Sequence, residues 1–217
     1  MLDLRPAALT LARTATSVRD DQLDEPTPCD VPVATLLVHV LGLSAAFRES
    51  GRKARGPLTA NPPPLVGAEL APDWREQLRV LLDELVTTWQ RPGAWDGTTQ
   101  IAGLEMPAVE VGFVANDELV LHAWDLAVAT GQAYDPHPDN LEAAWVMVSS
   151  TPDDPAARGG LFGPRLPVPD DASLLDRVLV GAGRDPQWGA STWRWQVHPE
   201  DEFDRPDLRR GASRARG

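Results

Sequence analysis

Apolar residues recur every three or four positions in four segments of the chain, which is the spacing of amphipathic helices. The first stripe comprises Leu4, Ala8, Leu11, Ala15 and Val18. Three further helices are predicted at about residues 32–53, 74–89 and 107–131. Pro32 and Pro107 suit a first helical turn, Pro92-Gly93 follows the third helix, and Gly131 suits a C-cap.

The segments between these helices carry few strand signals. The loop after residue 53 is rich in glycine and proline and contains Asn61-Pro62-Pro63-Pro64, so no helix is expected there. Residues 93–103 are predicted to form a loop or a short hairpin, and two shorter helices are expected at about 140–148 and 172–183. The pattern predicts an all-α four-helix bundle with short additional C-terminal helices. Residues 1–188 are expected to form this domain, and residues 189–217 a partly disordered tail.

Composition and charge narrow the classes of partner. The chain has 217 residues, 42% of them hydrophobic, and a formal net charge of −12. Such an acidic surface repels phosphate backbones, so nucleic acid is not an expected partner. The single cysteine, Cys29, excludes an intrachain disulfide, and the N-terminus lacks the pattern of a secretory signal. No run of about 18 consecutive apolar residues is present. We therefore expect a soluble, cytoplasmic protein without a membrane span.

Two polar residues interrupt the apolar stripe of the fourth predicted helix. Glu118 and His122 lie one turn apart on a face whose other members include Val111, Ala115 and Ala129. Side chains four residues apart on a helix can converge on one point. In the second predicted helix, His39 is the polar member of a stripe formed with Leu36, Leu43 and Ala46.

Two imidazoles and a carboxylate from two helices form a candidate set of metal ligands: His39, Glu118 and His122. A buried carboxylate is costly unless a cation or strong donors meet it, and a metal ion would offset that cost. Three ligands leave coordination positions open, as in catalytic zinc sites. Two other interpretations remain open at this point. Glu118 and His122 can form a hydrogen bond on a helix surface, and His39 can be a core histidine. A protein without metal would be expected to pair Glu118 with an arginine.

Several segments resemble the actinobacterial metal-binding relatives of mycothiol-dependent maleylpyruvate isomerase, within the DinB-like bundle superfamily. The resemblance extends over about residues 5–188. Its most specific element is Glu118-Leu119-Val120-Leu121-His122-Ala123-Trp124-Asp125 together with the upstream Leu36-Leu37-Val38-His39. The supporting segments are Thr27-Pro28-Cys29, Gly93-Ala94-Trp95-Asp96-Gly97, Arg158-Gly159-Gly160-Leu161-Phe162-Gly163, Asp176-Arg177 and Gly183-Arg184-Asp185-Pro186.

The resemblance implies a four-helix core in which His39, Glu118 and His122 bind a divalent metal, usually zinc, with Ni²⁺ or Fe²⁺ as alternatives. In the isomerase relatives the metal is thought to activate the thiol of mycothiol, so the implied partner is a low-molecular-weight thiol. The chain departs from the family at two points. The segment before the second helix lacks the expected tryptophan, and the chain after Pro186 is a short tail where the isomerase carries a further domain. Isomerase activity itself is therefore not implied.

Other residues have a functional and a structural interpretation. Asp125 could orient a metal ligand, although a helix-stabilising or loop-anchoring role is favoured, and Trp124 is expected to pack in the core. Arg158 and Arg177 could hold an anionic substrate, although structural ion pairs are favoured. Cys29 is expected to be an inert, partly buried thiol. His137 is expected in an exposed turn, and His198 in the tail.

Two functions therefore follow from the sequence. The first is a metal-dependent thiol transferase or isomerase, in which the metal activates a thiol or water. The second is a metal-containing binding or regulatory module without turnover. An open metal position facing a pocket would favour the first, and a fourth protein ligand would exclude it. A homodimer is possible for a bundle of this kind, but the sequence does not identify a surface that would form it.

Overall fold

The computed structural model describes residues 1–63, 69–158 and 161–189. His198 and almost all of the predicted tail lie outside these residues. The helices are α1 (Arg5–Thr16), α2 (Val33–Gly51), α3 (Pro57–Ala60), α4 (Trp74–Trp89), α5 (Ala108–Ala129), α6 (Pro138–Ser150), α7 (Pro155–Arg158) and α8 (Leu174–Gly181). Strands β1 (Thr98–Ile101) and β2 (Leu104–Pro107) form an antiparallel hairpin that pairs Thr98 with Pro107 and Ile101 with Leu104.

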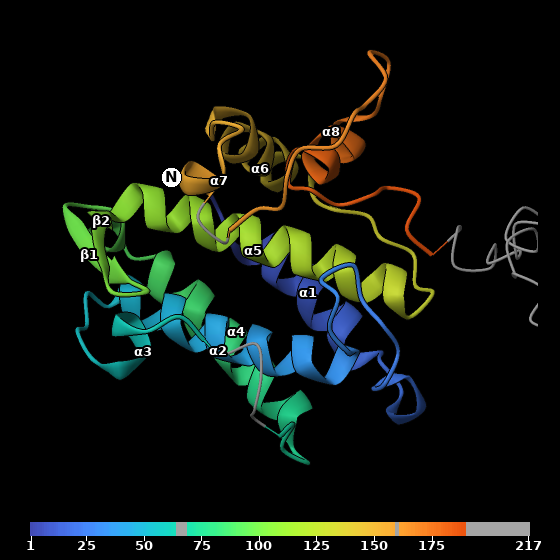
Figure 1. The fold of residues 1–217 in the computed structure, drawn as a ribbon. Helices are drawn as coiled ribbons and strands as arrows, with labels where there is room; N and C mark the ends of the chain where they lie inside the picture. Colours follow the sequence, from blue (N-terminus) through green and yellow to red (C-terminus); the bar gives the residue numbers. More distant parts are fainter. Residues whose placement is uncertain (64–68, 159–160, 190–217) are drawn as a thin grey trace, which may run out of the picture.

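Helices α1, α2, α4 and α5 form the bundle, as Figure 1 shows. Helix α2 packs against α4 and α5, and α1 packs against α4 and α5. The other face of α5 is covered by α6, against which α8 packs, so α5 lies between the bundle and a second layer (Figure 1). This position explains why most residues of α5, polar ones included, are buried. A helix with neighbours on opposite sides does not need a polar face.

The all-α fold predicted from the sequence is confirmed, including the C-terminal helices and the hairpin. The predicted range 74–89 matches α4, and the other predicted ranges differ by a few residues at the ends. Two short helices were missed. Helix α3 lies in the segment expected to be loop, because Pro57 supplies a first helical turn and Thr59 bonds to the amide of Gly56. Helix α7 is also a single turn, too short for a periodic stripe.

One helix meets the length and hydropathy criteria of a membrane span, which the sequence analysis did not anticipate. Within the described residues this is α2, Val33–Gly51. Half of its apolar window is buried inside the bundle, where the helix packs against α4 and α5. A core helix of this kind satisfies the same criteria because burial among other helices favours the same apolar residues.

Candidate metal centre

The structure brings His39, Glu118 and His122 together between α2 and α5. One ligand atom from each residue lies within 4.8 Å of the others. The two imidazole rings meet edge to face, with their centroids 5.3 Å apart. The two helices pack against each other along their length, and this packing places His39 beside the Glu118–His122 turn. The convergence predicted from two helical stripes is therefore present in the fold.

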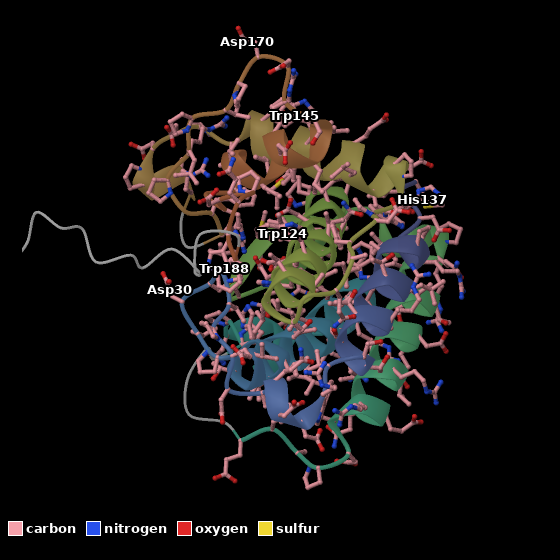
Figure 2. All side chains as sticks on the ribbon, turned by 90° about the vertical axis from the view of Figure 1, so that its right-hand side faces the viewer. Asp30, Trp124, His137, Trp145, Asp170 and Trp188 are labelled. Carbon is pink, nitrogen blue, oxygen red and sulfur yellow. The ribbon has the colours of Figure 1, made fainter. Side chains whose placement is uncertain are left out.

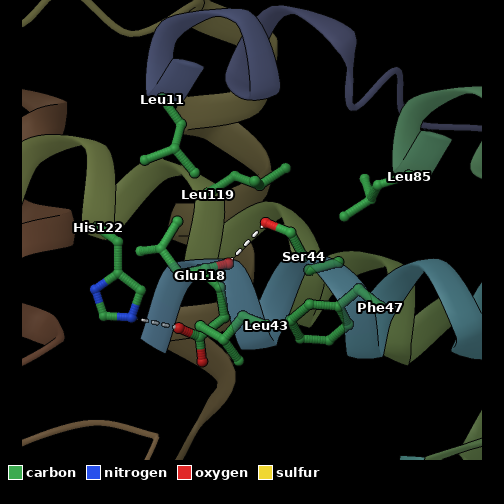
Figure 3. Close-up of a pocket in the computed structure, with 10 residues that line it drawn as sticks. Leu11, Leu43, Ser44, Phe47, Leu85, Glu118, Leu119 and His122 are labelled. Atoms are coloured by element: carbon green, nitrogen blue, oxygen red, sulfur yellow. Dashed lines mark hydrogen bonds and ion pairs between the residues drawn. The ribbon is translucent and has the colours of Figure 1, made fainter. Parts of the chain in front are cut away.

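Glu118 and His122 form a buried ion pair one helical turn apart. His122 Nε2 lies 2.8 Å from Glu118 Oε2, an interaction drawn in Figure 3. Burial alone would lower the pKa of His122, but hydrogen bonds with Asp125, Cys29 and Glu118 raise it well above its usual value. Burial alone would raise the pKa of Glu118, but the hydrogen bond and charge of His122 lower it. The pair is therefore charged in the metal-free protein, and no arginine forms an ion pair with Glu118 in the described part of the chain.

His39 differs from His122 because it has no carboxylate in direct contact. Burial, followed by the charge of His122, lowers its pKa, so its imidazole is neutral at neutral pH. Its Nδ1 atom is buried and has no hydrogen-bond partner among the described residues. A neutral imidazole is the form that binds metal ions.

Asp125 holds the other nitrogen of His122. Its Oδ2 atom lies 3.0 Å from His122 Nδ1 and also accepts hydrogen bonds from Cys29 Sγ at 3.1 Å and from Arg184 Nη2 at 3.2 Å. Burial would raise the pKa of Asp125, but the charge of Arg184 and the bond with His122 lower it. Asp125 thus anchors the segments that carry Cys29 and Arg184, in line with the loop-anchoring role favoured from the sequence, and it also contacts the ring of His122. Asp125 is a fully buried carboxylate that orients His122, the arrangement found behind metal-bound histidines.

Arg184 reaches this cluster from the segment after α8, and the sequence analysis assigned it no role. Helix α8 ends in a Schellman motif, in which Gly183 N donates to Val180 O and Arg184 N donates to Leu179 O. Gly183 has a φ of +83°, the left-handed conformation that this motif requires. Sequence signals for this turn exist in Gly183-Arg184, but they do not reveal that the arginine contacts Asp125, 59 residues away.

A pocket of about 410 Å³ opens beside these residues. Its lining comes from the segment before α2, from the three candidate ligands, and from the segments 161–164 and 182–184. The lining residues are Pro28, Cys29, Asp30, His39, Glu118, His122, Leu161, Phe162, Gly163, Pro164, Ala182, Gly183 and Arg184. On the bundle side of Glu118 and His122 lies a second, apolar cavity of only about 10 Å³ (Figure 3). The smaller cavity holds at most a water molecule, whereas the larger one is of the size that accommodates small-molecule ligands.

A second group of ligand types shares His122 with the first. Atoms of Cys29, His122 and Asp125 lie within 4.8 Å of one another. However, Arg184 Nη2 lies 3.2 Å from Asp125 Oδ2 and 3.7 Å from Cys29 Sγ, so a guanidinium already provides the positive charge there. This group is therefore less suited to a metal ion than the His39 group. In the described part of the chain, no fourth Cys, His, Asp or Glu joins His39, Glu118 and His122.

The remaining candidate residues lie away from the centre or serve the fold. Trp124 is buried in the core, as expected. His137 is exposed before α6 and lies at the opposite edge of the molecule from Asp30 (Figure 2). Arg158 donates to the carbonyls of Gly163 and Gly181. Arg177 donates to the carbonyls of Ala172 and Asp170. Both arginines are structural, mainly through backbone carbonyls rather than through the carboxylates that we expected.

Comparisons with known proteins identify relatives in sequence and in structure. No family model matches the chain. The uncharacterised proteins MT0763 and Rv0738, from two strains of Mycobacterium tuberculosis, are each 32% identical over 176 residues, which covers 77% of this chain and 88% of theirs.

Among solved structures, the mycothiol-dependent maleylpyruvate isomerase and a histidine-to-alanine mutant of it match with TM-scores of 0.57 and 0.58 and identities of 18% and 19%. Each match covers 84% of this chain and 87% of the isomerase chain, so little of the isomerase lies outside the shared part. At this identity the likeness establishes the fold.

Proposed function

Because this chain belongs to the family of the mycobacterial proteins MT0763 and Rv0738 and has the fold of mycothiol-dependent maleylpyruvate isomerase, we propose that it is a divalent-metal protein acting on a small molecule with a low-molecular-weight thiol. The observation that carries the proposal is the convergence of His39, Glu118 and His122 within 4.8 Å at the wall of a pocket of about 410 Å³. The family resemblance predicted from the sequence is confirmed.

The chemistry of the three residues fits a divalent cation. His39 is neutral and has a buried nitrogen without a partner, and Glu118 is ionised. Binding a cation would require His122 to release the proton that it shares with Glu118, while Asp125 continues to accept from Nδ1. Two imidazoles and one carboxylate favour zinc, with nickel or iron(II) as alternatives. When bound, such a cation supplies Lewis-acid chemistry that lowers the pKa of a thiol or water beside it.

The residues of the chain have separate tasks in this proposal. His39 and Glu118 present ligand atoms to the pocket, and Asp125 fixes the ring of His122 so that Nε2 faces Glu118. Leu161 and Phe162 provide apolar lining of the same pocket, which limits the water around a bound thiol. The pocket is large enough for a thiol together with a small electrophile. Mycothiol, the thiol of the structural neighbour, is the first candidate.

A non-catalytic binding module is the alternative. A fourth protein ligand would have favoured it, and in the described residues none joins the three candidates. The pocket at the ligands instead favours access by a small molecule. The cytoplasmic location and the homodimer remain predictions.

Metal content tests the proposal. The purified protein, reconstituted with zinc and dialysed, is expected to retain about one metal per chain by elemental analysis. Glu118→Gln and His39→Ala are expected to lose most of it. His137→Ala, which removes an exposed histidine far from the pocket, is the matched control and should retain it. Equal metal content in all four proteins, or none in the wild type, would refute the metal centre.

Turnover separates the enzyme from the binding module. Mycothiol and maleylpyruvate are incubated with the zinc-loaded protein, and the product is followed by chromatography. Conversion that requires both the thiol and Glu118 supports the enzyme. Full metal occupancy without conversion, and without conversion of other thiol and electrophile pairs, supports the module instead.

A further inference from the structure

We propose that Arg184 is a positioning residue for the metal centre: it holds Asp125 and, through Asp125, fixes the ring of His122. This inference rests on the proposed function in so far as His122 is a metal ligand. The segment after α8 lies outside the four-helix bundle. Through Arg184 it would control the metal affinity of a site whose ligands lie on α2 and α5.

Asp125 depends on Arg184 for its positively charged partner. The carboxylate is fully buried, and in the described residues its ion pairs are with Arg184 and His122. Arg184 Nε lies 3.4 Å from Oδ1 and Nη2 lies 3.2 Å from Oδ2, so the guanidinium contacts both oxygens. The third partner, Cys29, is a weak donor. A buried carboxylate that lost the guanidinium would be free to rotate or to take up a proton.

Arg184 is also held by contacts other than the one with Asp125. The Schellman motif fixes its backbone, and Nη1 donates to the carbonyl of Ala182 at 3.2 Å. Gly183 packs against Gly163 so closely that a Cβ at position 183 would lie 2.7 Å from the Gly163 backbone. Gly163 N donates to Ala182 O across the same contact. The guanidinium is therefore presented by a turn with packing and hydrogen bonds of its own, so its position does not depend on Asp125 alone.

Asp125 in turn contacts the candidate ligand His122. A hydrogen bond at Nδ1 determines which nitrogen of a histidine faces a metal and in what orientation. Here Asp125 Oδ2 contacts Nδ1, which leaves Nε2 facing Glu118. Removing Arg184 thus loosens a ring that Arg184 does not touch. Changes to partners of this kind cost about 10- to 100-fold in metal affinity.

The experiment compares zinc affinity in Arg184→Gln, Arg184→Lys, Asp125→Asn and the double variant of Arg184→Gln with Asp125→Asn. Competition with a chromophoric chelator gives each Kd. Arg184→Gln should bind zinc about 10- to 100-fold more weakly than wild type. Arg184→Lys keeps the charge but lacks the planar guanidinium, so its zinc affinity should lie between those of the wild type and Arg184→Gln. The double variant should bind no more weakly than Asp125→Asn, since Arg184 acts through Asp125.

Arg177→Gln is the matched control. It removes another arginine of the α8 region, one that donates to the carbonyls of Ala172 and Asp170 and has no contact with Asp125. Its zinc affinity should equal that of wild type. Wild-type affinity in Arg184→Gln would overturn the proposal, and so would additive losses in the double variant.

A second measurement uses the metal-free protein and separates this inference from the metal proposal. In ¹⁵N-edited NMR of chelator-treated samples, the Nδ1–H of His122 is expected as a slowly exchanging signal. Arg184→Gln should shift or broaden this signal as Asp125→Asn does, while Arg177→Gln should leave it unchanged. If the wild type binds no zinc, only the metal proposal fails, and this spectrum still decides the role of Arg184. An unchanged signal in Arg184→Gln would overturn that role.

Discussion

The pKa values of two buried aspartates on α5 are shifted in opposite directions, and exchanging each for asparagine should have opposite effects on stability. Burial, with the nearby charge of Glu118, raises the pKa of Asp117 well above its usual range. Asp125 has a lowered pKa because the charge of Arg184 and the bond with His122 outweigh its burial. Asp117 Oδ1 has no hydrogen-bond partner in the described part of the chain. Asp117→Asn therefore replaces a neutral carboxyl by a neutral amide of the same shape.

The magnitude follows from proton linkage. Above about pH 4 the unfolded chain releases the Asp117 proton and the folded protein retains it, so stability falls by about 1.4 kcal/mol per pH unit until the folded pKa is reached. Asp117→Asn lacks this loss. The free energy of unfolding of the variant should therefore rise relative to that of the wild type as pH increases from 4.5 to 6.5, by at most about 3 kcal/mol.

Urea unfolding of chelator-treated protein at pH 4.5, 5.5 and 6.5 measures this difference. Asp125→Asn is the matched control. It deprives Arg184 of its buried partner and should be destabilised by about 3–5 kcal/mol at pH 6.5. If the difference in free energy of unfolding between wild type and Asp117→Asn does not widen as pH rises, the protonation state inferred for Asp117 is wrong.

Two further predictions concern the turn after α8 and the pH dependence of the metal-free site. Gly183→Ala should lower the free energy of urea unfolding by at least about 1–2 kcal/mol, because the φ of +83° disfavours a Cβ and Gly163 leaves no room for one. Gly93→Ala is the control, since an added Cβ there would have nothing within 4 Å. Equal losses in the two variants would contradict this explanation. The raised pKa of His122 stabilises chelator-treated protein fully below about pH 6.5, and this contribution is lost as pH rises through the folded value. His122→Gln should lack this decline, and parallel pH–stability curves for the two proteins would count against it.

The choice between the two interpretations of Asp125 shows where sequence reasoning reached its limit. Spacing placed Asp125 three residues after His122, which is compatible with either role. The structure shows both kinds of contact: Asp125 meets Nδ1 of His122, and it also holds Cys29 and Arg184 from the segments before α2 and after α8. Asp117 directly precedes the segment 118–125, but its burial depends on the layers that cover both faces of α5.

The sequence by itself determined the longer helices and the candidate ligands. Helical periodicity is a local property, so the Glu118–His122 turn and the inward stripe of His39 follow from residue spacing alone. The tertiary structure decided which residues from distant segments meet: the 410 Å³ pocket, and the contact between Arg184 and Asp125 across 59 residues. Such contacts depend on how helices pack and how connecting turns direct the chain, and spacing within one segment carries no information on either.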